Sequence, residues 1–181
     1  MKYLPALLIA IVLSGCSAVY TTKPVGENPK NLTHEVPEWE GVWCNAEGDT
    51  FKVNVADPAK GLLQVAGIEE KGNTFELKKY TIHLRESGNW CFASCRNEDV
   101  KDRDLYVWAR ISRDGRQIIF WAPDTDKFKQ LVTKGQLPGK IEKDEVVLGE
   151  LDPKQMELIT SGSNGVLLQW EKPMILTKVS K

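Results

Sequence analysis

The middle of the chain is a series of short segments in which apolar and polar residues alternate. Phe51, Val53 and Val55, for example, alternate with polar neighbours. Further apolar segments cover residues 62–68, 75–84, 90–95, 105–111 and 117–121. A period of two indicates strands with one buried face, and short turns such as Asp114-Gly115 separate the segments. Because no long helical pattern interrupts them, the segments predict an antiparallel meander, whose natural closed form is an up-and-down barrel or a curled sheet.

One of these segments changes its pattern halfway along. Phe75 and Leu77 alternate with polar residues, but after Lys78-Lys79 the apolar set shifts by one position to Tyr80, Ile82 and Leu84. One extra residue in a strand has this effect, and it bends the sheet. The sequence therefore predicts a β-bulge at Lys78-Lys79.

Two short helices are expected in the C-terminal half. Asp124 can cap the first, which ends near Gly135, and Asp152, with Pro153 and Gln155 after it, begins the second, which ends near Gly162. Short strands are expected at residues 145–149, 166–171 and 174–179. We expect both helices to pack on the sheet or to cover one mouth of the barrel.

The first expected strand begins with Gly41-Val42-Trp43, after Trp39. These three residues resemble the Gly-x-Trp motif of lipocalins and other calycin barrels. The resemblance implies that Trp43 closes one end of a barrel. The predicted fold class is therefore mainly β with minor α: an antiparallel meander that closes into a lipocalin-like barrel or a curled sheet.

The first fifteen residues have the pattern of a secretory signal. Lys2 precedes an apolar run from Leu4 to Leu13 that is too short to span a bilayer. Leu13-Ser14-Gly15-Cys16 resembles the lipobox of bacterial lipoproteins, which implies cleavage before Cys16 and lipidation of that cysteine. Ser17 fits the pattern that sorts such proteins to the outer membrane. The expected location is the bacterial cell envelope, with a lipid anchor in the outer membrane and the domain facing the periplasm; the alternative is an ordinary secretory signal whose cysteine is incidental.

Residues 16–37 have several prolines and no hydrophobic period, so we expect the lipidated cysteine and a flexible tether there, followed by a single β-rich globular domain at 38–181. The chain has 24 basic and 25 acidic side chains, which gives no indication of nucleic-acid binding. No second apolar run approaches the length that spans a membrane. The lipid is therefore the only membrane contact expected.

Three further cysteines, Cys44, Cys91 and Cys95, would lie in an oxidising periplasm. In one strand, Cys91 and Cys95 share a face but lie about 13 Å apart, too far to bridge each other. Cys44 could form a disulfide with either from a neighbouring strand, or all three could be small buried residues. With His34 and His83 as the only histidines, we expect no metal site and no cofactor.

Aromatic residues are the most conspicuous candidates for a binding site. The chain has six tryptophans, all in or beside expected strands. They are Trp39, Trp43, Trp90, Trp108, Trp121 and Trp170. They could line a ligand cavity or simply form the core, because an eight-stranded barrel has room inside for side chains or for one small ligand.

No catalytic motif was found, and His83 is expected to be exposed on a polar strand face. Two classes of function follow. The first is a non-enzymatic interaction or structural module of the envelope, whose partner is an envelope protein or polymer. The second is a lipocalin-like carrier of a small apolar ligand. A carrier predicts a cavity lined by tryptophans, and an interaction module predicts a filled barrel with an exposed apolar patch.

Overall fold

The computed structural model describes residues 18–71, 74–97 and 104–180. The fold is mainly β, with short helices before the first barrel strand and in the C-terminal half. The strands are β1 (Val19–Thr21), β2 (Asn28–Pro29), β3 (Gly41–Cys44), β4 (Thr50–Asp57), β5 (Leu62–Lys71), β6 (Thr74–Ser87), β7 (Trp90–Arg96), β8 (Tyr106–Asp114), β9 (Gln117–Trp121), β10 (Gly139–Glu142), β11 (Glu145–Leu148) and β12 (Met174–Ser180). The helices are α2 (Val36–Trp39), α3 (Thr125–Thr133), α4 (Pro153–Thr160) and the 3₁₀ helix η1 (Gly162–Leu167).

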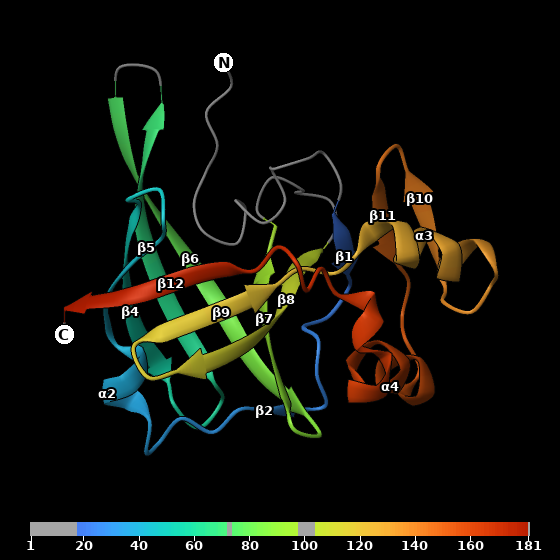
Figure 1. Cartoon of the computed structure of the whole chain (residues 1–181), viewed down its shortest axis with the longest axis horizontal. Coiled ribbons are helices and arrows are strands. Elements are labelled where there is room, and N and C mark those ends of the chain that lie inside the picture. The colour runs from blue at the N-terminus through green and yellow to red at the C-terminus, as the bar shows by residue number, and fades with distance from the viewer. Residues whose placement is uncertain (1–17, 72–73, 98–103, 181) are drawn as a thin grey trace.

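Eight of the strands form a closed antiparallel barrel. Strands β3 to β9 pair in sequence order, and β12 returns between β9 and β3 to close the barrel (Figure 1). The turn between β8 and β9 is tight, and its Gly115 has a positive φ of 56°, a conformation that glycine adopts without strain. The predicted meander and its closure into a lipocalin-like barrel are confirmed.

Large side chains fill the described interior of the barrel. Trp43, Phe51 and Phe120 point inward from β3, β4 and β9 and are almost fully buried. Aliphatic residues of the other strands pack against them, among them Val65, Ile82, Leu84, Ile111 and Leu176. This is the alternation that the sequence predicts, since every second residue of these strands is buried.

A second core lies outside the barrel, on the outer face of β7 and β8. Phe92 and Trp108 project outward from these strands and pack with Phe128 of α3 and Ile159 of α4. Figure 1 shows both helices on this side of the molecule, beside β10 and β11. The expected packing of the helices on the sheet is confirmed. Within the described residues, no helix is long and apolar enough to cross a membrane.

Both predicted helix caps are present. The Asp124 side chain accepts hydrogen bonds from the backbone N–H groups of Asp126 and Lys127. Asp152 Oδ1 accepts from the Gln155 backbone N–H at 2.9 Å, and Gln155 Oε1 accepts from the Asp152 N–H at 3.0 Å. This reciprocal pair is a capping box, and it fixes where α4 begins.

The strand expected at residues 166–171 is absent, because η1 occupies the first part of that range. Leu167 and Leu168 are adjacent and both buried, whereas a strand with one buried face buries every second residue. Among the described residues, the β-type pairing of this stretch is limited to one isolated antiparallel bridge between Pro123 and Leu168. The apolar pair was misread as a strand, but the neighbouring prediction at 174–179 is confirmed as β12.

The flexible tether predicted for residues 16–37 is wrong for residues 18–37. β1 pairs with β8 on one side and with β11 on the other, so it joins the barrel to the outer strands. Val25 and Leu32 have no exposed surface. The segment was misread because Val25 and Leu32 stand singly among polar residues and show no period, yet the fold buries both. Cys16 and the signal segment lie outside the described residues.

The bulge predicted at Lys78-Lys79 is also wrong. β5 and β6 pair without a register shift from Leu62 opposite His83 to Lys71 opposite Thr74. Register shifts occur instead in β4, between Val55 and Asp57, and in β12. The change in pattern has another cause: the end of the β5–β6 hairpin projects beyond the other strands (Figure 1), and there the outward face carries the apolar residues.

Candidate functional site

One end of the barrel is closed by α2 and the side chains around it. The Trp43 ring is fully buried, and its indole Nε1 donates a hydrogen bond to the Trp39 carbonyl at 2.9 Å. Lys178 of β12 lies with its Nζ 5.5 Å from the centre of the Trp43 ring and donates to the carbonyls of Pro37 and Glu38, at 2.7 and 3.2 Å. This places Trp43 where the Gly-x-Trp resemblance implies, at a closed end.

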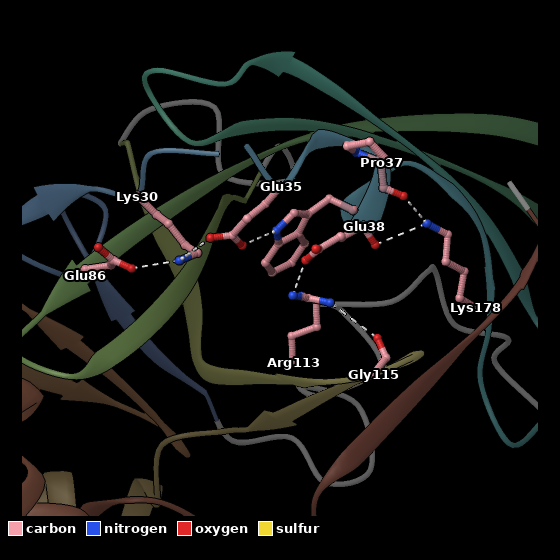
Figure 2. Close-up of polar contacts among 9 residues, drawn as sticks. Lys30, Glu35, Pro37, Glu38, Glu86, Arg113, Gly115 and Lys178 are labelled. Atoms are coloured by element: carbon pink, nitrogen blue, oxygen red, sulfur yellow. Dashed lines mark hydrogen bonds and ion pairs between the residues drawn. The ribbon is translucent and has the colours of Figure 1, made fainter. Parts of the chain in front are cut away.

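Ion pairs surround this closure (Figure 2). Lys30 Nζ contacts Glu86 Oε1 at 2.8 Å and Glu35 Oε1 at 3.4 Å. The other carboxylate oxygen of Glu35 accepts a hydrogen bond from Trp39 Nε1 at 3.1 Å. Arg113, on β8, pairs with Glu38 of α2. The network therefore connects the N-terminal segment to β6 and β8, and each charged side chain in it has a partner of opposite charge.

The charges of this network favour its ionised form. Burial alone would raise the pKa of Glu35, but the hydrogen bond from Trp39 and the charge of Lys30 lower it below the ordinary value. Burial alone would lower the pKa of Lys30, but the hydrogen bond to Glu86 and nearby negative charges raise it. These groups are paired at neutral pH, so the arrangement is suited to holding the barrel end closed rather than to proton transfer.

The six tryptophans do not line one cavity. Trp39 and Trp43 belong to the closed end, and Trp108 is buried in the second core. Trp90, Trp121 and Trp170 gather outside the barrel. A hollow of about 300 Å³ lies beside β9, β12 and the β3–β4 turn, and none of the six tryptophans lines it.

The three outer tryptophans surround Arg110. Arg110 is on the outward face of β8, and its guanidinium carbon lies 4.5, 4.7 and 5.0 Å from the ring centres of Trp90, Trp121 and Trp170. The sequence analysis did not single out Arg110. The available signal was one basic residue in the middle of the apolar segment 105–111, which gives no information about what faces it.

The three cysteines are free thiols. Cys91 and Cys95 share the inward face of β7, as predicted, and burial raises the pKa of Cys91 to about 12. Cys44 is on β3, and three strands separate β3 from β7 in the barrel. Cys44 therefore does not lie on a strand next to β7, as a disulfide to Cys91 or Cys95 would require. Of the two alternatives, the structure bears out the second for Cys91 and Cys95, which fill the barrel interior as small residues.

The expectation of an exposed His83 needs correction, because this side chain is half-buried. Its ring lies edge-on to Tyr106, with 5.9 Å between the ring centres. Burial and the nearby charge of Arg85 lower the pKa of His83. Across the three described ranges, no group of three or more histidine, cysteine, aspartate or glutamate side chains is placed to hold a metal ion.

The projecting end of the β5–β6 hairpin has an exposed apolar face. Ile68, Phe75 and Leu77 are 69%, 76% and 61% exposed. Ile68 pairs directly with Leu77, and Phe75 follows on the same side of β6, so the three side chains share one face. The opposite face carries an ion pair between Glu76 and Lys78 at 3.3 Å. We call Ile68, Phe75 and Leu77 the hairpin patch.

Comparison of the chain with protein-family models, curated proteins and solved structures gave no match.

Proposed function

We propose that this chain is an outer-membrane lipoprotein, anchored through Cys16 and facing the periplasm, and that it acts as a non-enzymatic interaction module. The hairpin patch is the observation that supports an interaction role. Three large apolar side chains, each more than half exposed, lie together on an element that projects from the barrel. Contiguous exposed apolar groups on a soluble domain are typical of a surface that another molecule covers.

A protein partner fits the patch better than the interior of a bilayer does. The Glu76–Lys78 ion pair lies on the other face of the same strand, and charged groups are costly to bury in lipid. A projecting two-stranded hairpin also brings backbone polar groups with it, which lipid cannot satisfy. A partner that covers one face of the hairpin leaves the charged face in water.

The alternative, a carrier of a small apolar ligand, has less support. Side chains of all eight barrel strands pack in the described interior, and four of the six tryptophans point away from it. A hidden ligand would need space that Phe51, Phe120 and Trp43 now occupy. The filled interior therefore favours the interaction role.

Site-specific photo-crosslinking in intact cells tests the partner. A photoreactive residue at Phe75 should give a crosslinked product of one defined mass, whereas the same residue at Glu76, on the opposite face, should not. Replacing both Ile68 and Leu77 with serine should remove the product. A product of twice the chain mass would mean that the partner is a second copy of this chain. Crosslinks to lipid alone, or equal products from both positions, would contradict a protein partner at the patch.

The anchor is tested separately. Growth with a clickable palmitate analogue should label the wild-type chain, and Cys16→Ala should abolish both the label and its recovery with outer membranes. Cys44→Ala, which leaves the lipobox intact, is the matched control. Unlabelled wild-type chain would mean that the signal is an ordinary secretory one.

A further inference from the structure

Arg110 differs from the other described arginines because no oxygen acceptor faces it among the described residues. Arg96 pairs with Asp104, and Arg113 pairs with Glu38. Arg85 donates to the backbone carbonyls of Gly26 and Glu27, and Arg116 donates to that of Lys178. The guanidinium of Arg110 lies against the faces of three tryptophan rings.

The guanidinium of Arg110 is therefore held in place with its hydrogen-bonding capacity unused. Its Nε is buried and has no partner among the described residues. Burial lowers the pKa of Arg110, yet a guanidinium stays protonated near neutral pH. Ring faces attract the cation but accept no strong hydrogen bond, so the planar fork of N–H donors is left for a group from outside.

The surrounding rings are firmly placed. Trp90 and Trp121 come from β7 and β9, which flank β8, and Arg110 is directly opposite Trp121 in the register. Trp170 donates from its indole Nε1 to the Gly165 carbonyl and lies 5.0 Å from Trp121, centre to centre. A Cβ added at Gly165 would lie 3.3 Å from the Trp90 ring, so the backbone there packs closely on the cluster.

One wall of the cluster is open to solvent. Trp170 is 39% exposed and also lines a surface hollow of about 500 Å³ near the start of α3. Lys127 and Lys172 line this hollow together with Asp124, Asp126 and Glu171, so its own side chains do not select an anion. Arg110 does not line the hollow and adjoins it through the Trp170 ring, so the attraction for an anion must come from Arg110. An exposed aromatic face beside a fixed cation suits a ligand with a flat apolar part and an anionic group, because the two parts need different neighbours.

We propose that the Arg110 cluster is a binding site for a small anion of this kind: a carboxylate or phosphate ester whose anionic group pairs with the Arg110 guanidinium and whose planar part packs on Trp170. The site lies on the outside of the barrel, away from the hairpin patch, and does not depend on the role proposed for that patch. A carboxylate and a phosphate can both pair with the N–H donors of a guanidinium. The proposal is therefore an anionic group, and the experiment below compares a carboxylate with a phosphate.

The test uses the full-length chain in detergent micelles, labelled with ¹⁵N-arginine. The Nε–Hε signal of Arg110, assigned by its loss in Arg110→Lys, reports on the guanidinium directly. Benzoate and phenyl phosphate are titrated as the carboxylate and phosphate probes, with benzyl alcohol as the neutral match. At least one anion should give a saturable shift of the Arg110 signal below about 10 mM, and benzyl alcohol should give none.

Variants then test which group binds. By tryptophan fluorescence, Arg110→Gln should weaken binding of the better anion by roughly tenfold or more, since it removes a charge-assisted pair. Arg96→Gln, an exposed arginine with its own carboxylate partner, should leave the affinity unchanged. The proposal is overturned if neither anion gives a saturable shift, if benzyl alcohol shifts the signal equally, or if folded Arg110→Gln binds as well as wild type. If Arg110→Gln does not fold, the wild-type titration against the neutral probe decides.

Discussion

At the residue scale, Lys178 explains how a very short helix can close the barrel. α2 spans four residues, which is too few for a helix to be stable by itself. The Val36 carbonyl accepts the Glu40 N–H, and Lys178 supplies donors to the next two carbonyls, those of Pro37 and Glu38, while its charge lies over the Trp43 ring. One side chain from the last strand thus fixes the segment that precedes the first barrel strand.

Glu35 makes the stability of this closure depend on pH. Its pKa is lowered in the folded protein, so ionised Glu35 contributes stability above the unfolded value of about 4.5, and this contribution is lost as the pH falls through the folded pKa. Glu35→Gln keeps an acceptor for Trp39 but removes the charge. At pH 7 we expect it to lower the free energy of unfolding by up to about 1 kcal/mol, a discounted value because the carboxylate is partly exposed.

Urea unfolding of wild type and Glu35→Gln at a series of pH values checks this. The difference between the two proteins should be largest near neutral pH and should shrink as the pH falls below about 4.5 and then through the lowered folded pKa of Glu35. Glu47→Gln, an exposed carboxylate on the β3–β4 turn, serves as the control and should change stability little at any pH. A Glu35 effect that does not shrink down to the lowest pH at which the protein stays folded would show that the substitution acts through packing and not through the charge.

At the scale of single elements, the cap of α4 has a defined energetic role. Asp152→Ala removes the acceptor for the Gln155 N–H, and loss of such a cap costs about 1 kcal/mol. The helix also contacts the barrel through a 2.9 Å hydrogen bond between Thr160 and Ser87, so fraying of α4 should weaken the second core. Chemical denaturation of Asp152→Ala beside the surface variant Glu157→Ala measures the difference; equal stabilities would mean that the tertiary contacts alone hold α4.

The caps and the barrel could be predicted from the sequence because their signals are local. A capping box needs residues three apart, and a half-buried strand shows its period within a few residues. The barrel followed because seven such strands are joined by short turns, so neighbours in sequence are neighbours in the sheet. Each of these predictions depends only on adjacent stretches of chain.

The errors occurred where distant parts of the chain decide the outcome. Val25 and Leu32 are isolated apolar residues in a polar stretch, and only the completed fold provides the surfaces that bury them, the second core for Val25 and the barrel core for Leu32. In β6 the apolar residues change from the inward to the outward face at Leu77, because this part of the hairpin projects beyond the barrel. A sequence pattern shows that apolar residues alternate, but it does not show which face of the strand the rest of the protein covers. Arg110 is surrounded by rings from three separate segments, an arrangement without a local signal.

At the scale of the whole molecule, the N-terminal segment belongs to the fold at both of its ends. Near Ala18 it lies between β8 and β11, and near Trp39 it closes the barrel. If Cys16 is lipidated as proposed, only Ser17 separates it from the buried Ala18, and these two residue steps reach about 7 Å at most. The barrel would then be held against the membrane, whereas a flexible tether of some twenty residues would allow a separation of about 25 Å.

Deletion of the segment distinguishes a structural part from a tether. A chain that begins at Glu38 lacks β1, the Lys30 ion pairs and the buried Val25 and Leu32. Burial of each large apolar side chain contributes about 1.5–3 kcal/mol, so losing several of them approaches the whole stability of a typical domain. We expect this chain to lose its cooperative thermal transition by circular dichroism and to aggregate in size-exclusion chromatography. A chain that begins at Ser17 keeps every described residue and should unfold in one sharp transition; if both chains unfold at the same temperature, residues 18–37 add nothing to the fold and the tether interpretation is restored.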